Sequence, residues 1–564
     1  MSKKIIALMM VGMLALVVFV GCNSDDTSTP AAPTTTAAAA TTAAGETPAT
    51  TTAEVAAPAE FSYPMDFDGT LTWWKPMENN WATFLTNFGE TGHSRALIEA
   101  TGIDIEWIHP PLGQHNENFS LMVVSGNFPD IIQWNWNTNF PGGPGAAISD
   151  RVILELNDAI AQWAPNYQAL LARYPGLYQQ VVTDEGQHFT FPFLRIDDIL
   201  KVTTGPVVRA DWLEELGLEP PETIDEWEYM LTRFRDDMGA TTGWTGQAGQ
   251  GDPNGLLNMF LPAFGIRTGF FNQGGQIEYG FTDPAFRDFL ELMARWYADG
   301  LIDPNIFSTS RAEMDAAILT GTSGAVIGPG GGAVGPWLHA AWSNDPGTSF
   351  DLVPTRFPSF ERGVYVSHGP GSWDFALGSH GHAAISAASS NVEVATRLLD
   401  FAFSEEGYLL YNYGVYGHTW TWVNGVPTYT DHILNHPEGR SFAQALSYYA
   451  RAAMNGPFRQ SGLYLYQFYE LDQQKEALVQ WGRLNDSTAT MLPPVSFTIE
   501  ESNRVAARMA DIDTFRREGI SRFITGTDPI NDDTWNHFVN TLNNFGVPEL
   551  IEIHQAAMDR FNAR

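Results

Sequence analysis

Cysteine is almost absent from this sequence: 564 residues contain one, Cys22. A single cysteine cannot close a disulfide within the chain, and it cannot build a thiolate zinc or iron–sulfur site, both of which need several cysteines. Basic residues are also scarce, with 30 Lys and Arg against 65 Asp and Glu, and the only lysines beyond residue 60 are Lys75, Lys201 and Lys475. Without a basic patch, the sequence argues against nucleic acid as a partner.

Several catalytic motifs are missing or incomplete as well. There is no G-x-S-x-G serine motif and no P-loop. The run Gly330–Gly335 fits G-x-G-x-x-G, but Asp351 begins an apolar run instead of ending a strand, so the acidic residue that a dinucleotide site needs is lacking. His432 and His436 lack the glutamate of H-E-x-x-H. We therefore expect no enzyme activity, no cofactor and no metal.

The N-terminus has the pattern of an export signal. Two lysines precede the apolar run Ile5–Val20, which is at the short end for a membrane-spanning helix and is followed directly by polar residues. Gly21 and Cys22 resemble the cleavage site of a bacterial lipoprotein signal, although Phe19 stands where an aliphatic residue is usual. We expect residues 1–22 to be that signal, with lipid attached to Cys22. A retained membrane anchor and an ordinary secretory signal are the alternatives.

Residues 23–60 consist mostly of Ala, Thr and Pro and contain no aromatic residue. Such a segment cannot bury enough surface to offset the entropy lost on ordering. We expect a disordered tether between the lipid anchor and a globular part that begins at Phe61.

The globular part begins with a β-α-β-α-β pattern. Gly69–Pro76 is predicted to be a strand, His93–Pro111 a helix followed by a strand, and Glu117–Asn137 a second helix and strand. This order predicts an α/β fold with a parallel sheet covered by helices.

Three further features mark the ends of predicted elements. Thr223 and Glu226 have the spacing of a capping box at a helix start. Gly300 is expected to end a helix, and Asn424-Gly425 to form the turn of a hairpin. The chain from Ile499 onward is predicted to be mostly helical.

Five stretches, in this order, resemble the large lipoprotein branch of extracellular solute-binding proteins of ABC importers (family 1, carbohydrate type): SGNFPDII, VVRADWLEELGLEPPETIDEW, WYADGLIDPN, FSEEGYLLYNYGVYGHTW and FITGTDPINDDTWNHFVNTLNNFGV. The resemblance implies two hinge-linked, discontinuous α/β lobes of the periplasmic-binding-protein type II. We expect one lobe in residues 61–191 and about 373–425, a second in residues 192–372, and a mostly helical region from about 426 to 564 that packs on the lobes.

The resemblance also implies a function. We expect a monomer, lipid-anchored on the extracellular face of a bacterial cell membrane. It is expected to capture a carbohydrate, in particular an oligosaccharide, by hinge closure and to pass it to the permease subunits of an ABC transporter. A surface-anchored glycoside-active enzyme and a sensor subunit that presents its ligand to a receptor are the alternatives. Some relatives bind calcium in an acidic loop after the helix with the DEW motif, but Asp236–Gly255 lacks alternating carboxylates, so we expect no calcium there.

Aromatic residues supply the candidate ligand contacts, because flat apolar rings pack on the C–H faces of sugars. Ligands of α/β proteins bind beyond the carboxyl ends of strands and at the junction between domains. These rules select the following residues: Trp73, Trp74, Trp134, Asn135, Trp136, Trp244, Trp337, Trp373, Tyr416 and Trp420. Trp134 and Trp136 are expected on one face of a continuing strand, and Trp244 in a polar loop. The simpler interpretation, that most tryptophans belong to the core, remains open at this point.

Overall fold

The computed structural model describes residues 61–77, 79–376, 380–483 and 487–564. The expected signal, Cys22 and the tether of residues 23–60 lie outside the described residues, so they stay predictions. In the described part of the chain, no helix combines the length and the apolar character needed to cross a membrane.

The first sheet has the strand order β10-β3-β1-β2. β1 pairs in parallel with β2 and with β3, whereas β10 runs antiparallel to β3. The strands are β1 (Thr70–Trp74), β2 (Asp104–Ile108), β3 (Ile131–Trp134) and β10 (His382–Ile385). The parallel β-α-β-α-β order expected from the sequence is confirmed.

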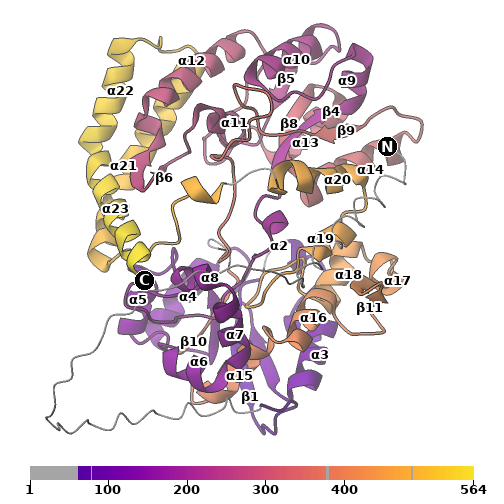
Figure 1. Ribbon diagram of the computed structural model, residues 1–564, viewed down its shortest axis with the longest axis vertical. Helices are drawn as coiled ribbons and strands as arrows, with labels where there is room; N and C mark the ends of the chain where they lie inside the picture. Colours follow the sequence, from indigo (N-terminus) through magenta and orange to yellow (C-terminus); the bar gives the residue numbers. More distant parts are fainter. Residues whose placement is uncertain (1–60, 78, 377–379, 484–486) are drawn as a thin grey trace, which may run out of the picture. The chain divides into compact units, whose positions relative to one another are not determined.

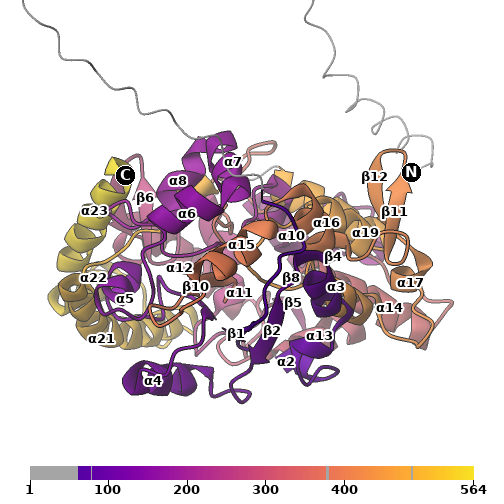
Figure 2. The ribbon, with the colours of Figure 1, turned by 90° about the horizontal axis from the view of Figure 1, so that it is seen from below.

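The helices that accompany the first sheet come from two stretches of the chain. They are α2 (Asn79–Ala82), α3 (Gly92–Thr101), α4 (His115–Ser125), α5 (Gly143–Ser149), α6 (Asn157–Trp163), α7 (Pro165–Arg173), α8 (Pro175–Val181), α15 (Val392–Phe401) and α16 (Glu405–Tyr413). Figure 2 shows β1 and β2 side by side, and α6, α7 and α8 gathered together.

The second sheet has the order β5-β8-β4-β9, with β5 and β8 parallel and β4 antiparallel to β8 and β9. Its strands are β4 (Thr204–Arg209), β5 (Thr242–Thr245), β8 (Ser323–Pro329) and β9 (Leu352–Pro354). Its helices are α9 (Ala210–Leu216), α10 (Ile224–Asp236), α11 (Asn254–Phe260), α12 (Pro284–Ala298), α13 (Arg311–Thr320), α14 (Gly335–Asn344) and α20 (Asp472–Ala477). A hairpin of β6 (Phe270–Gln273) and β7 (Gln276–Tyr279) follows α11 in the chain.

Two more groups complete the described chain. The hairpin β11 (Trp420–Val423) and β12 (Val426–Tyr429) is followed by α17 (Asp431–Leu434), α18 (Phe442–Tyr449) and α19 (Leu463–Phe468). The tail is helical, as expected: α21 (Ile499–Ile524), α22 (Asp532–Phe545) and α23 (Val547–Ala563). Figure 1 shows these three helices together, in yellow, beside α12.

The predicted element ends are confirmed where local chemistry sets them. Thr223 and Glu226 form both bonds of a capping box at the start of α10. Asn424 and Gly425 have φ angles of 52° and 77°, which a tight hairpin turn requires. α12 ends at Ala298, and Gly300 has φ 71° just beyond it.

The buried apolar side chains form separate cores around the two sheets. The first core takes residues from 71–194 and 375–458, and the second from 202–357 and 477–553. A third cluster, from Leu200 and 413–478, lies around β11, β12, α18 and α19. The structure thus divides the expected region 426–564: its first part builds the third cluster, and its tail helices join the second core.

The chain passes between the two cores in segments that lie side by side. Leu194 forms an antiparallel bridge with Phe375 and a parallel bridge with Arg459. We call residues 191–196, 373–376 and 457–460 the crossing segments. Their mutual backbone bonds give the two α/β lobes a common connection.

Candidate functional site

The carboxyl ends of the parallel strands bring polar residues to one edge of the first sheet. Lys75, His109 and Asn135 follow β1, β2 and β3 directly. Because β10 is antiparallel to β3, His380, which precedes β10, lies at the same edge. We call Lys75, His109, Asn135 and His380 the first edge.

The first edge is held together by bonds to the backbone. Nδ1 of His109 lies 2.8 Å from the carbonyl oxygen of Lys75, and Nζ of Lys75 donates to the carbonyl of Asn455 at 2.8 Å. Gln133 donates its side-chain amide to the carbonyl of His380 at 2.7 Å. The first two bonds hold the His109 ring and the Lys75 ammonium group in place, and the third holds the backbone at His380.

The ring of His380 lies between aromatic neighbours and a polar side chain. Its ring centre lies 4.9 Å from that of Trp134 and 5.6 Å from that of His115, and its Nε2 lies 3.4 Å from Nδ2 of Asn139. Burial lowers the pKa of His380, and the charges of His115 and Lys75 lower it further. A neutral imidazole can donate from one nitrogen and accept at the other, which suits sugar hydroxyls.

The matching edge of the second sheet is built from glycine. β8 runs into Gly330–Val334, a π-helical turn that leads to α14. A Cβ on Gly330 would lie 3.1 Å from the hydroxyl of Tyr469, so the residue must be small for the tyrosine to approach. The Gly-rich run therefore allows Tyr469 to pack closely against it.

Most of the tryptophans selected from the sequence are core residues. Each of the following side chains is at most 4 % exposed: Trp73, Trp74, Trp134, Asn135, Trp136, Trp244, Trp337 and Trp420. Trp74 and Trp134 pack edge to face with ring centres 5.4 Å apart, and Trp73 stacks on Trp107 at 4.7 Å. Their contact with a ligand stays a prediction. Asn135 belongs to the first edge, and Trp134 packs against His380 of that edge.

Two details of the sequence interpretation are wrong. Trp244 does not lie in a polar loop: it lies in the central part of β5, and its ring is fully buried against Phe260. Trp136 does not extend β3, which ends at Trp134. The backbone turns at Asn135, whose carbonyl accepts from the N–H of Asn139 at 3.0 Å. Apolar packing outweighed the polar flanking residues in the first case, and turn formation ended the strand in the second.

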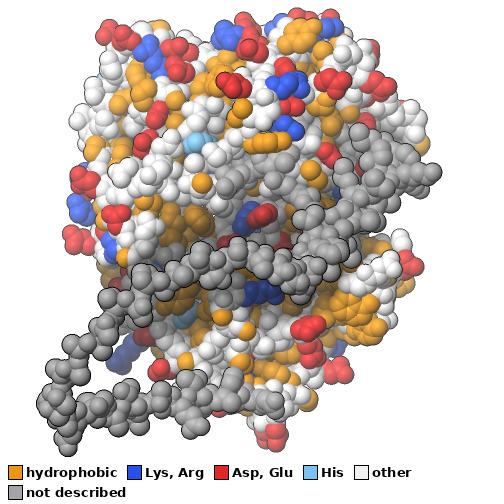
Figure 3. Space-filling model, in the orientation of Figure 1, with side chains coloured by type: hydrophobic (Ala, Val, Ile, Leu, Met, Phe, Trp, Pro, Cys, Tyr) orange, Lys and Arg blue, Asp and Glu red, His pale blue; other side chains and the backbone are white. Residues whose placement is uncertain are grey.

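Trp373 and Tyr416 are the selected residues that retain exposure. Trp373 lies in a crossing segment, and its indole N–H donates to the carbonyl of Leu492 at 3.0 Å. Tyr416 is 62 % exposed and packs edge to face on Trp420, which in turn contacts Trp422. Figure 3 shows apolar side chains gathered over the region of β11, where this aromatic group lies.

Sequence reasoning did not select the histidines of the first edge, nor Arg195 in the crossing segments. A signal was present, because strand ends attract functional residues. What the sequence lacked was the antiparallel placement of β10, which brings His380 next to Trp134.

Metal ligands do not come together in the part of the chain described. No group of three or more His, Cys, Asp or Glu residues is placed there to hold an ion. The connection from α10 to β5 spans Asp237 to Thr241, which is shorter than the roughly 12 residues of an EF-hand loop. Asp236 pairs with Arg235 at 2.7 Å. The residues present there do not fit a calcium ion.

Comparison with known proteins decides the family. Residues 91–408, more than half of the chain, match the family described as bacterial extracellular solute-binding protein. The chain belongs to this family. The two-lobe α/β architecture of this solute-binding protein agrees with that of its structural relatives.

Among curated proteins, the chain is similar to the fructooligosaccharide ABC transporter substrate-binding protein FusA of Streptococcus pneumoniae. The two are 22 % identical over 503 residues, which cover 83 % of this chain and 86 % of FusA. It is also 23 % identical over 274 residues to the polygalacturonan/rhamnogalacturonan-binding protein YtcQ of Bacillus subtilis, covering 48 % of this chain and 52 % of YtcQ.

Two solved structures show the same fold. The alginate-binding protein AlgQ2, crystallised without calcium ion, gives a TM-score of 0.68 at 22 % identity, over 88 % of this chain and all of AlgQ2. FusA of S. pneumoniae in complex with kestose gives 0.66 at 19 % identity, over 88 % of this chain and all of FusA. At these sequence identities the two structures show a shared fold and do not identify the ligand of this chain.

Proposed function

We propose that this solute-binding protein captures an oligosaccharide between its two lobes and delivers it to an ABC permease. The supporting observation is the likeness to FusA along 83 % of the chain, since FusA is a substrate-binding protein for fructooligosaccharides. The first edge is consistent with the proposal. The imidazole of His380 is partly exposed and can bind a sugar hydroxyl, whereas both ring nitrogens of His109 are already bonded to the backbone, at Phe88 and Lys75.

The same edge argues against glycoside hydrolysis. A glycosidase needs two carboxylates that flank one sugar bond. The side chains of the first edge are instead lysine, imidazole and amide groups: Lys75, His109, Asn135 and His380. We therefore infer a binding protein that performs no covalent chemistry.

Capture would work by movement of the lobes. A ligand that touches both lobes favours the closed form by its differential affinity for that form. The crossing segments would act as the hinge, since they run between the cores. A permease that recognises the closed form would then receive loaded protein in preference to empty protein.

The test is calorimetric titration of residues 61–564 with neutral and acidic oligosaccharides, with tryptophan emission recorded in parallel. Saturable binding of one glycan class with a shift in emission supports the proposal. Peptides of similar mass serve as the control ligand class. A folded protein that binds peptides tightly and no glycan would refute carbohydrate capture.

The anchor and the partner need separate tests. Labelled palmitate should enter the full chain in bacterial cells and not its Cys22→Ser variant, which should leave the membrane fraction. Crosslinking in the presence of ligand should recover permease subunits. Recovery of a receptor in their place would favour the sensor alternative.

A further inference from the structure

Arg195 lies where the crossing segments meet. Its backbone N–H donates to the carbonyl of Asp374 at 2.8 Å, and the neighbouring N–H of Leu194 donates to the carbonyl of Phe458 at 3.0 Å. The backbone is thus fixed from both sides. The Cα atom of Arg195 therefore has a defined position in the crossing segments.

The guanidinium of Arg195 has few protein partners. Nε donates to Oε1 of Gln460 at 3.1 Å, and Cζ lies 5.3 Å from the ring centre of Phe193. Within the described residues, no carboxylate lies at salt-bridge distance from Arg195, and Nη1 and Nη2 have no hydrogen-bond partner. Neither nitrogen is fully shielded from solvent.

Other buried arginines differ from Arg195 in this respect. Arg516 makes a two-pronged pair with Asp252 at 2.7 and 2.8 Å. Arg564 pairs with Asp184 at 2.6 Å. Arg267 and Arg451 are also largely buried without a carboxylate, but their Nη atoms donate to the backbone carbonyls of Ser487 and Ser447. The Nη atoms of Arg195 have no such partner among the described residues.

The surroundings make this guanidinium a strong anion ligand. Burial lowers the pKa of Arg195, because the charged form loses hydration. Arginine nevertheless stays protonated near neutral pH, since its ordinary pKa is above about 12. A desolvated cation with two free donor nitrogens matches the two oxygens of a carboxylate.

The neighbours of Arg195 place it next to the second sheet. The phenol groups of Tyr464 and Tyr469 are near enough to Arg195 to affect its pKa. Tyr469 also lies against Gly330 and Gly331, at the carboxyl end of β8. Arg195 is therefore close to the region between the lobes where the ligand is proposed to lie.

We propose that Arg195 binds the carboxylate of a uronic acid, so that the captured oligosaccharide contains acidic sugar units. This inference rests on the proposed function. The net charge of −35 disfavours long polyanions, whereas one buried cation suits a single carboxylate within a short oligosaccharide. Gln460 acts as a positioning residue, because its amide oxygen orients Nε of Arg195.

The decisive experiment compares the binding of one oligosaccharide in its charged and its uncharged form. Trigalacturonate and its fully methyl-esterified form are titrated into residues 61–564, with trimannuronate, triguluronate and neutral kestose as further probes. We expect at least one uronate to bind about 10- to 100-fold more tightly than its ester, as a hydrogen-bonded carboxylate–arginine pair should contribute.

Two variants test the residue itself. Arg195→Gln should weaken uronate binding to about the level of the ester and leave binding of the ester unchanged. Gln460→Glu places a carboxylate beside Nε and should also weaken uronate binding by supplying an internal counterion. Arg287→Gln, at a partly exposed arginine of α12 that pairs with Glu291 and Asp532, carries the same change in net charge and should leave uronate binding unchanged.

The outcomes are distinguishable. Equal affinity for acid and ester, neutral glycans binding better than uronates, or full uronate affinity in folded Arg195→Gln would each overturn the inference and leave carbohydrate capture standing. Failure of every glycan to bind the folded protein would overturn both proposals.

Discussion

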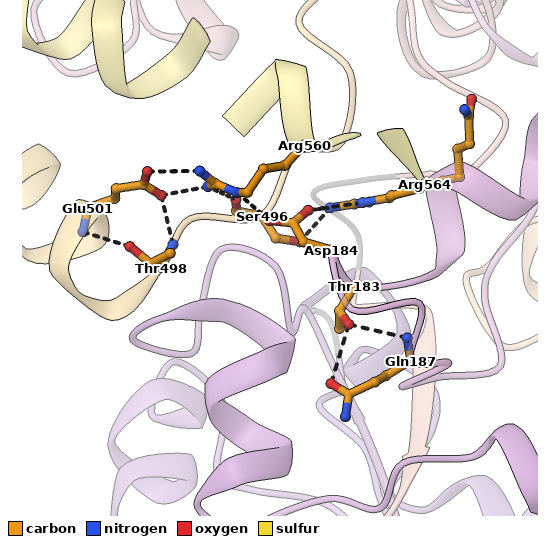
Figure 4. Close-up of polar contacts among 9 residues, drawn as sticks. Thr183, Asp184, Gln187, Ser496, Thr498, Glu501, Arg560 and Arg564 are labelled. Atoms are coloured by element: carbon orange, nitrogen blue, oxygen red, sulfur yellow. Dashed lines mark hydrogen bonds and ion pairs between the residues drawn. The ribbon is translucent and has the colours of Figure 1, made fainter. Parts of the chain in front are cut away.

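Nη2 of Arg564 lies 2.6 Å from Oδ1 of Asp184, and this contact ties α23 to the chain that follows α8 (Figure 4). Arg560 reaches the other oxygen of Asp184 at 2.6 Å and also pairs with Glu501. The side chain of Arg564 is 1 % exposed and that of Asp184 is 12 % exposed. The tail helices of the second core thus hold a segment of the first core through one carboxylate.

Removing that carboxylate should destabilise the protein strongly. Asp184→Ala leaves two arginines without their shared partner, and breaking a buried ion pair from one side costs about 3–5 kcal/mol. Urea denaturation measures the loss in the free energy of unfolding. Asp528→Ala removes the partner of Arg522 at an exposed pair and should cost less than about 1 kcal/mol. Similar losses in both variants would contradict the role of burial.

Asp400 should make the protein less stable as the pH rises. Its carboxylate accepts from the N–H of Tyr167 at 2.8 Å and from Asn166, but burial raises its pKa to about 6. A raised acidic pKa stabilises the fold at low pH, and that contribution is lost as the pH passes through about 6. Relative to Asp400→Asn, the wild type should lose about 2 kcal/mol between pH 4 and 7. Parallel pH profiles of the two proteins would refute this.

His382 should act in the opposite direction. The ring is fully buried, Nδ1 accepts from the N–H of Phe193 at 3.2 Å, and burial lowers the pKa to about 3. The unfolded chain takes up a proton below about pH 6.5 while the folded chain does not, so stability falls as the pH falls. Between pH 7 and 5 the wild type should lose about 2 kcal/mol more than His382→Asn. An equal loss in both proteins would show that His382 has the same pKa in the folded and the unfolded state, which would contradict the prediction.

His380 should contribute to ligand affinity. Replacing it with alanine removes the imidazole that lies 4.9 Å from Trp134, and with it one neutral hydrogen bond to a hydroxyl. Calorimetry with the glycan found for the wild type should give about 5- to 10-fold weaker binding. His339→Ala, at an exposed histidine near Glu470, is the matched control and should bind as the wild type does. Unchanged affinity in His380→Ala would place the ligand away from the first edge.

Calcium should have no effect on stability. The carboxylates near the end of α10 already pair with arginines, Asp236 with Arg235 and Asp237 with Arg233, and the turn to β5 is short. An ion that binds only the folded state raises the melting temperature. Melting curves in calcium and in chelator should therefore agree within about 1 °C. A rise of several degrees with calcium would reveal a site elsewhere in the chain.

Local chemistry explains what could be predicted from the sequence. The capping box of Thr223 and Glu226, the turn at Asn424-Gly425 and the helix end near Gly300 depend on residues within a few positions of one another. The alternation of strands and helices along the chain likewise predicted that β1, β2 and β3 are parallel. Five motifs along the chain were enough to indicate the family.

The burial of the tryptophans could not be predicted, because it depends on partners far away in the sequence. Trp244 was expected in a polar loop, yet Phe260 and the second core enclose it. Trp134 acquires its place from β10, which is almost 250 residues further along and pairs with β3 in the opposite direction. Aromatic residues favour strands and cores as readily as binding sites, and composition does not distinguish these roles.

The sequence by itself determined the α/β class and the ends of several elements, since these follow from short-range patterns of polarity, glycine and capping residues. The family and its two lobes were indicated by the resemblance of five motifs. Only the tertiary structure decided that His380 lies beside Trp134 and that Arg195 has no carboxylate partner among the described residues. The presence or absence of a counterion depends on which distant segments pack together, and that is set by the burial of both cores as a whole.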